Sequence, residues 1–450
     1  MNNQKKLGAI SFLPLLVFLL LYVGCGVTFT VLGYESPFSY FPRHVALLAG
    51  IGVAMLINRG MKISDKLDVL CENAGNPGVM MIGLIYLLAG GFQGAAAAMG
   101  GKDSVVALGL SVIPAVLLVP GVFLMSCFIS TAIGTSMGTI AAMGPIAIGI
   151  AGQAGLNMPL TCAAVIGGAY FGDNLSMISD TTISAAKGCG SEMKDKFKMN
   201  FFIAAPAAIV ACILFGLLGG SGAIDKSTLH YSLIQILPYI VVLVTALMGF
   251  NVVGVLFIGI VMTGIIGLAQ GTVGFFEWVQ AIGGGMSDMF SITIVAILIS
   301  GIIGLIRAYG GVDWLVEKIT GRISSRKGAE YGIGLLAGVL SGALVNNTIA
   351  IIISAPIAKE IGGKYQIAPK RLASLIDIFA CAFLSLMPHD GGMLMIQGFT
   401  QAATGTAVSP IAVMGYSFYT FALLIATCIT IQFGLLRSKE GKTPQAAEEK

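Results

Sequence analysis

Uninterrupted apolar stretches of bilayer length recur along the whole chain and constrain its fold more than any other feature. Residues 79–99, 201–219 and 252–270 are three of them, and longer runs cover 104–133 and 160–185. A transmembrane helix needs about 20 apolar residues. In lipid, only helices and closed barrels satisfy every backbone polar group, and these runs lack the two-residue alternation of barrel strands. The sequence therefore predicts an all-α polytopic membrane protein of the plasma membrane.

Composition supports this interpretation. Of 450 residues, 56% are hydrophobic and only 10% are charged, whereas soluble domains carry about 25% charged residues. The net charge of +4 is small and sits in loops, which argues against a nucleic-acid partner. Most of the eight cysteines lie inside apolar runs, and the chain has only three histidines. We therefore expect neither a disulfide framework nor a zinc site, and no cofactor.

An internal repeat divides the chain. The segment Ala98-Met-Gly-Gly-Lys-Asp103 returns as Ala308-Tyr-Gly-Gly-Val-Asp313, and Pro145-Ile-Ala returns as Pro356-Ile-Ala. The offset stays near 210 residues throughout. We expect one repeat in 78–200 and a second in 288–400. The remaining segments are then N-terminal scaffold helices (1–77), connecting scaffold helices (201–287), and a last helix with a cytoplasmic tail (401–450).

Basic residues indicate that the two repeats are inverted. Segment 187–198 contains four lysines, while its counterpart 397–408 contains no Lys or Arg. Segment 359–371 contains three lysines and Arg371, while its counterpart 149–161 has none. Because basic loops stay on the cytoplasmic side, equivalent loops are expected on opposite faces of the membrane. Inverted repeats are typical of secondary transporters, which bind substrate near the midplane at discontinuous helices.

Each repeat contains a first polar interruption at a matching place. Gly134-Thr135-Ser136-Met137-Gly138 splits one apolar run, and Val345-Asn346-Asn347-Thr348 splits the other. Hydroxyl, amide and freed carbonyl oxygens suit a small hard cation. The matched positions favour a cation site at Thr135, Ser136, Asn346, Asn347 and Thr348. The alternative is a polar cluster that hydrogen-bonds neighbouring helices.

A second interruption runs from Gly168 to Thr182. It contains Asp173 and Asp180 seven residues apart, with Ser176 between them, so a continuous helix would present all three on one face. Carboxylates inside a membrane run indicate a functional site by default, and both are candidate cation ligands. Asp180 has the alternative role of capping a following helix.

The counterpart in the second repeat supplies Asp377, His389 and Asp390. Asp377 lies within an otherwise apolar run, which favours an ion or proton role. His389 titrates near neutral pH in an ordinary environment, but beside Pro388 a hydrogen-bonded structural role is an equal alternative. Together with Ser176, these three are secondary or proton-binding candidates.

Several strings resemble the NhaC family of Na+/H+ antiporters. They are Ile129-Ser-Thr-Ala-Ile-Gly-Thr-Ser136, Gly144-Pro-Ile-Ala147, Gly168-Ala-Tyr-Phe-Gly-Asp173 and Ser179-Asp-Thr-Thr182. The resemblance implies inverted repeats with helical hairpins, elevator-type alternating access and a homodimer. It also implies that Asp173 and Asp180 bind Na+ or a proton near Thr135, Ser136, Asn346 and Asn347.

Other functions remain open at this stage. One is a Na+- or H+-coupled transporter or exchanger of a small organic anion or amino acid, held by helix N-termini. Another is an intramembrane aspartyl protease, but Tyr170-Phe-Gly-Asp173 lacks the first glycine of Gly-x-Gly-Asp. A channel is a third possibility. The paired breaks favour a Na+/H+ exchanger that is not an enzyme.

Overall fold

The computed structural model describes residues 7–32, 34, 40–112, 114–176, 179–220, 230–248, 250–321 and 323–436. Within these ranges every regular element is a helix. Six of the described helices are long and apolar enough to cross a membrane: Gly8–Phe29, Pro77–Ala98, Ser136–Ala154, Met193–Leu218, Val252–Gln270 and Phe275–Ala308. The all-α multi-span prediction is confirmed. The predicted cytoplasmic tail from residue 437 onward lies outside the described residues.

The N-terminal part and the connecting part each consist of consecutive helices. The first contains the short elements η1(Gly8–Phe12), α1(Leu13–Leu19), η2(Leu20–Gly24) and α2(Cys25–Val31), then α3(Arg43–Ile57) and α4(Ile63–Ala74). The connecting part contains α12(Leu233–Leu247) and α13(Val252–Gln270).

The two segments that repeat in sequence have a similar helix order. The first contains α5(Pro77–Ala98), α6(Gly101–Val112), η3(Ala115–Leu117), α7(Leu118–Ile133), α8(Ser136–Ala154), α9(Met158–Leu175) and α10(Asp180–Cys189), and α11(Met193–Leu218) runs from its end into the connecting part. The second contains α14(Phe275–Ala308), which begins before it, then α15(Gly311–Thr320), α16(Arg326–Leu344), α17(Asn347–Tyr365), α18(Pro369–Ser385) and α19(Gly391–Thr404); α20(Pro410–Gly415) and α21(Phe418–Gln432) follow it. Helices α5 and α14 end at the paired alanines Ala98 and Ala308, and α6 and α15 begin at the paired glycines Gly101 and Gly311.

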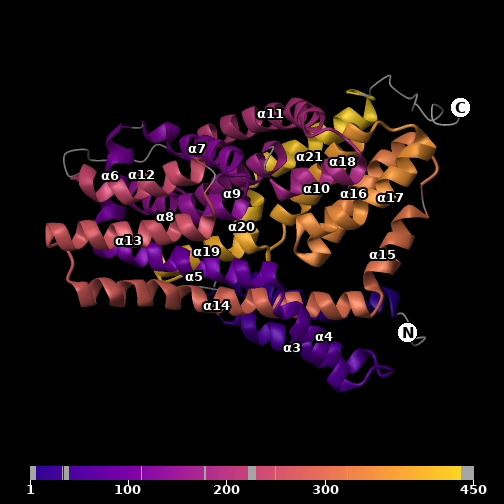
Figure 1. The fold of residues 1–450 in the computed structure, drawn as a ribbon, viewed down its shortest axis with the longest axis horizontal. Coiled ribbons are helices and arrows are strands. Elements are labelled where there is room, and N and C mark those ends of the chain that lie inside the picture. The colour runs from indigo at the N-terminus through magenta and orange to yellow at the C-terminus, as the bar shows by residue number, and fades with distance from the viewer. Residues whose placement is uncertain are drawn as a thin grey trace, which may run out of the picture.

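Helices α5 and α14 lie side by side along one edge of the molecule, with α3 and α4 beside α14 (Figure 1). Glycines make this approach possible. A Cβ at Gly94 would meet the Ala281 carbonyl, and a Cβ at Gly285 would meet the Gly90 carbonyl. Gly90 and Gly94 lie four residues apart, the spacing of small residues that lets membrane helices pack closely.

The same device recurs in the interior of the molecule. Gly168 and Gly172 of α9 face α7, where a Cβ would meet the Phe123 carbonyl and Ser130 respectively. Gly334 and Gly338 of α16 face the Phe379 and Phe383 rings of α18. These contacts fix α9 and α18, the two helices that carry Asp173 and Asp377.

Two predicted continuous runs are interrupted. The 104–133 run divides into α6 and α7 around Pro114, because proline has no N–H to donate and disfavours helix in the residue before it. The 160–185 run divides into α9, which ends at Leu175, and α10, which begins at Asp180. The prediction that Asp173 and Asp180 share one helical face is therefore wrong.

Candidate functional site

The first pair of predicted breaks is present in both segments, with the same backbone geometry. After α7, Gly134 is left-handed (φ 76°) and Thr135 is extended, and α8 begins at Ser136. After α16, Val345 is left-handed (φ 49°) and Asn346 is extended, and α17 begins at Asn347. The break before α17 places the β-branched Val345 in a backbone conformation that favours glycine. This is a locally strained arrangement of the kind found at functional sites.

Asp173 lies in the last turn of α9 and is buried. Its Oδ1 accepts a hydrogen bond from the Ser136 backbone N–H at 3.1 Å and a longer one from the Ser179 hydroxyl at 3.5 Å. The first N–H groups of a helix have no partner within the helix and favour a negative oxygen. The break before α8 thus orients the Asp173 carboxyl.

Asp180 begins α10, so it lies one residue inside the helix and Ser179 is the N-cap residue. Asp180 Oδ1 accepts from the Thr181 backbone N–H at 3.0 Å. Its other oxygen, Oδ2, accepts from the Thr348 hydroxyl at 2.7 Å. This bond joins the aspartate of one segment to the helix break of the other.

The second break of the later segment lies between α18 and α19. Asp390 caps α19, since its Oδ2 accepts from the backbone N–H groups of Gly392 at 3.0 Å and Met393 at 3.4 Å. His389 is buried, and its ring lies edge-on to Phe18 at 6.1 Å. Neither of its ring nitrogens has a hydrogen-bond partner of ordinary geometry among the described residues.

One cavity of about 390 Å³ connects these elements. Nine of the residues singled out from sequence border it: Thr135, Ser136, Asp173, Asp180, Asn346, Asn347, Thr348, His389 and Asp390. Side chains from α5 and α14 complete the wall, among them Tyr86 and Arg307. The breaks before α8 and α17, the aspartates Asp173 and Asp180, and the break before α19 therefore meet at one cavity, whose wall also carries apolar side chains.

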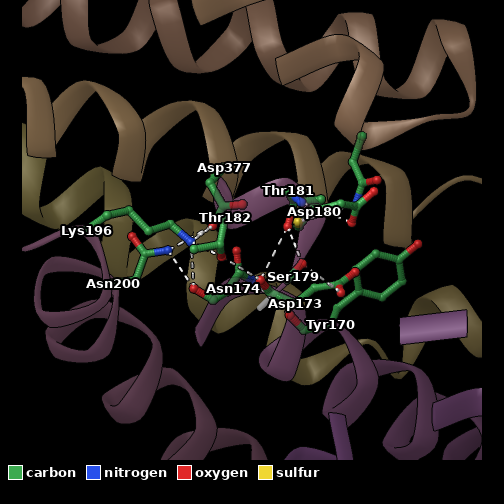
Figure 2. A network of polar contacts seen from close by, with 12 residues as sticks. Tyr170, Asp173, Asn174, Ser179, Asp180, Thr181, Thr182, Lys196, Asn200 and Asp377 are labelled. Carbon is green, nitrogen blue, oxygen red and sulfur yellow. Dashed lines mark hydrogen bonds and ion pairs between the residues drawn. The ribbon is translucent and has the colours of Figure 1, made fainter. Parts of the chain in front are cut away.

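Two of the sequence candidates do not border this cavity. Ser176 is a buried residue at the C-terminal end of α9. Asp377 forms a fully buried ion pair with Lys196, with 2.7 Å between Lys196 Nζ and Asp377 Oδ2. Asn200 Nδ2 donates to the same carboxylate oxygen at 2.9 Å. Figure 2 shows this pair beside the α9–α10 break.

Lys196, Asn200, Tyr86 and Arg307 are polar residues of this region that sequence reasoning missed. Lys196 was counted as a loop charge, yet its side chain is fully buried. Tyr86 and Arg307 lie on apolar helices without a recognisable motif, and the Tyr86 hydroxyl donates to the Gly391 carbonyl at 2.8 Å. The sequence offered one signal for Tyr86 and Arg307: the repeat offset pairs α5, which carries Tyr86, with α14, which carries Arg307.

A metal centre built from ionisable ligands is not found in the part of the chain that the structure describes, since no three His, Cys, Asp or Glu side chains there are grouped to hold an ion. The donors at the cavity are of another kind. Three carboxyls, those of Asp173, Asp180 and Asp390, lie among hydroxyls, amides and helix N-termini. Oxygen donors of this kind suit a hard cation.

Broken helices that meet at a cavity inside a multi-span helical protein are typical of a membrane transporter. Comparison with known sequences narrows the class. The chain belongs to the Na+/H+ antiporter family, whose model matches residues 7–220 and 224–437. The resemblance drawn from the sequence motifs is confirmed, and membership in a transporter family agrees with the expectation that the chain is not an enzyme.

Individual relatives have low sequence identity to this chain, but the matches cover most of its length. The chain is 26% identical over 380 residues to the Na(+)/H(+) antiporter NhaC of Alkalihalophilus pseudofirmus, covering 76% of this chain and 79% of the relative. It is 26% identical to the Na(+)/H(+) antiporter NhaC of Bacillus subtilis, covering 97% of this chain and 100% of the relative. It is also 23% identical to the arginine/ornithine antiporter ArcD of Halobacterium salinarum, covering 82% and 81%.

Proposed function

We propose that this protein exchanges Na+ for H+ across the membrane, with Asp173 and Asp180 binding the cation or the proton in turn. The observation that carries the proposal is that two helix breaks from different segments and both aspartates border one cavity of about 390 Å³. Family membership and the two NhaC relatives support the choice of ions.

The proposed chemistry is competition at carboxylates. A carboxyl that holds a proton offers no negative oxygen to Na+, and a bound Na+ repels an incoming proton. The Ser136 N–H holds Asp173 in place, and the Thr348 hydroxyl holds Asp180. Hydroxyl and amide oxygens of Thr135, Ser136, Asn346 and Asn347 then complete the shell of a dehydrated Na+.

Exchange requires that the cavity face each side of the membrane alternately. We propose that residues 78–200 and 288–400 are inverted repeats whose broken helices form the moving part. Residues 1–77 and 201–287 serve as the scaffold in this scheme. The matched backbone geometry at Gly134-Thr135 and Val345-Asn346 supports it, because paired discontinuous helices are the common feature of alternating access.

The test is dissipation of a pH gradient in proteoliposomes on addition of Na+, Li+ or K+. Asp173→Asn is expected to abolish Na+-dependent proton flux while leaving the fold intact, because the amide keeps the size of the side chain. Asp103→Asn is the matched control, since Asp103 lies in the first turn of α6 and does not border the cavity. Flux that persists in Asp173→Asn would contradict the assignment.

A second candidate function is exchange of a small organic anion or amino acid, and one observation favours it. Arg307 borders the cavity, and its buried Nε has no hydrogen-bond partner among the described residues. A water molecule occupies about 30 Å³ of liquid, so about 390 Å³ exceeds the volume of a Na+ with its first water shell. A guanidinium is the usual partner of a carboxylate.

Uptake of labelled carboxylic acids and amino acids separates the two functions. If a carboxylate is carried, Arg307→Gln is expected to abolish its uptake while the wild type retains it. Absence of uptake for every compound in the panel would remove this second candidate and leave the Na+/H+ exchanger.

A further inference from the structure

Lys196 forms an ion pair with Asp377 inside the protein. It lies in the first turn of α11, and its side chain is fully buried. Its Nζ is 2.7 Å from Asp377 Oδ2, 2.9 Å from the Asn174 carbonyl oxygen and 2.6 Å from Thr182 Oγ1 (Figure 2). A carboxylate, a carbonyl and a hydroxyl therefore surround a single positive charge, as they would surround a small hard cation.

Some buried oxygens of the same residues lack a hydrogen bond of ordinary geometry. Asn200 Nδ2 donates to both the Asn174 carbonyl and Asp377 Oδ2, at 2.9 Å each. Asp377 Oδ1, Asn174 Oδ1 and Asn200 Oδ1 are buried without a hydrogen-bond partner of ordinary geometry in the described residues. Two hydroxyls approach these oxygens: that of Thr181 faces the Asp377 carboxyl, and that of Tyr419 faces Asn174. Oxygen acceptors left over around a charge mark a place suited to a cation.

This oxygen cage lies directly behind the cavity. Asn174 follows Asp173 in the chain, and the Asp173 carbonyl accepts from the hydroxyls of Thr181 at 3.4 Å and Thr182 at 3.3 Å. Thr182 thus contacts both the peptide that carries the cavity carboxylate and the Lys196 ammonium. The two places are adjacent, but only the one at Asp173 borders the cavity.

We propose that the cage formed by Asp377, Asn174 and Thr182 is a second cation site, which the chain fills with its own Lys196 ammonium. A tethered cation cannot leave, so it neutralises Asp377 throughout the cycle and restricts Na+ to the cavity. Lys196 thereby limits the number of Na+ ions that each protein binds. The choice of Na+ as the probe rests on the proposed function, whereas occupation of the cage by the ammonium rests on the contacts alone.

Lys196→Met tests the proposal, because methionine has nearly the length of lysine but neither its charge nor its donors. Binding of radioactive Na+ to purified protein in detergent is measured at equilibrium. The wild type is expected to bind about one Na+ and Lys196→Met about two, as the freed oxygens accept a hard cation. Lys196→Met/Asp377→Asn removes the cage carboxylate as well and is expected to return the number to about one.

If Lys196→Met is too unstable for the binding measurement, its thermal stability in different salts tests the proposal. Removing one partner leaves a buried charge unpaired, which is strongly destabilising, and a bound cation stabilises the folded state by mass action. Lys196→Met is therefore expected to melt at a higher temperature in NaCl than in choline chloride, by a larger margin than the wild type. An equal margin, with one Na+ bound as in the wild type, would overturn the proposal.

A second buried ion pair provides the control. Arg371 Nη2 of α18 lies 3.0 Å from Glu330 Oε2 of α16, and both side chains are buried. Neither residue borders the cavity. Arg371→Met removes one buried cation but leaves Arg326 Nε 3.9 Å from Glu330 Oε1, so it is expected to gain no Na+. A gain there would show a general effect of removing a buried cation and would overturn the assignment to the Lys196 cage.

The wild-type arm separates the two proposals. Wild-type protein that binds no Na+ and shows no Na+-dependent proton flux would remove the proposed function, while a Na+ gained by Lys196→Met would still support the cage. Wild-type exchange combined with unchanged binding in Lys196→Met would remove the cage and leave the exchanger.

Discussion

The Thr348 hydroxyl donates a 2.7 Å hydrogen bond to Asp180 Oδ2. Thr348 lies in the first turn of α17 and Asp180 begins α10, so the bond joins the two segments that repeat in sequence. Both residues border the cavity. Movement of either segment alone would break this bond, which makes it a direct mechanical and electrostatic link across the proposed site.

Replacing Thr348 with valine is expected to weaken Na+ binding. The substitution removes the donor that orients Asp180 while preserving the shape of the side chain. A hydrogen bond to a charged group contributes about 1.5–3 kcal/mol, so the Na+ concentration for half-maximal exchange should rise about tenfold or more. Thr348→Ser, which keeps the hydroxyl, should stay close to the wild type. An unchanged half-saturation in Thr348→Val would exclude a role for this bond in Na+ binding.

Proton competition at the cavity gives a defined pH dependence. At low pH the carboxyls hold protons and exclude Na+, and at high pH they are free to bind it. The half-saturating Na+ concentration is therefore expected to fall as pH rises, by at most about tenfold per pH unit for each proton displaced. Titrations of Na+ in proteoliposomes at several equal internal and external pH values measure the slope. A flat profile in the wild type would argue against shared carboxylates.

Substitutions of Asp390 distinguish a helix-capping role of this residue from an ion-binding role. Its Oδ2 accepts from two N–H groups at the start of α19, and the residue also borders the cavity. Asparagine caps helices about as well as aspartate, whereas alanine costs about 1 kcal/mol. Asp390→Asn is expected to keep its melting temperature and most of its transport, while Asp390→Ala should melt earlier. Loss of transport in Asp390→Asn at unchanged stability would assign the carboxylate to ion or proton binding instead.

The sequence alone identified the helix breaks because their signals are local. Gly134 supplies the left-handed residue after α7, and Asn346 supplies its own cap, accepting from the Ile349 N–H at 2.8 Å. The repeat offset then showed that the two breaks correspond. Convergence on one cavity followed from the expectation that paired broken helices meet at the midplane, and the structure brings nine of the candidates together there.

The roles of Lys196 and Arg371 were not visible in sequence, for a physical reason. Each lies in the first turn of a helix beside a basic segment, where a charge is usually solvated. Each is instead buried against an acid on a distant helix, Lys196 against Asp377 and Arg371 against Glu330. Sequence position gives the charge but not its burial, and only the packing of α11, α16 and α18 pairs these groups. Two of the charges used to infer inversion are therefore structural.

The wall of the cavity depends on the close approach of α5 and α14, which a single methyl group should disrupt. A Cβ at Gly285 would meet the backbone carbonyl of Gly90, and a backbone cannot yield as a flexible side chain can. Gly285→Ala is expected to destabilise the protein by about 1–3 kcal/mol, the usual range for overpacking, and to slow exchange, because α5 and α14 both line the cavity.

Gly283→Ala is the matched control: it lies on the same helix, and an added Cβ there meets no atom within 4 Å. Melting temperatures in detergent should fall for Gly285→Ala and hold or rise for Gly283→Ala, since alanine is the better helix former. Equal melting temperatures for the two variants would mean that this glycine contact does not hold α5 against α14.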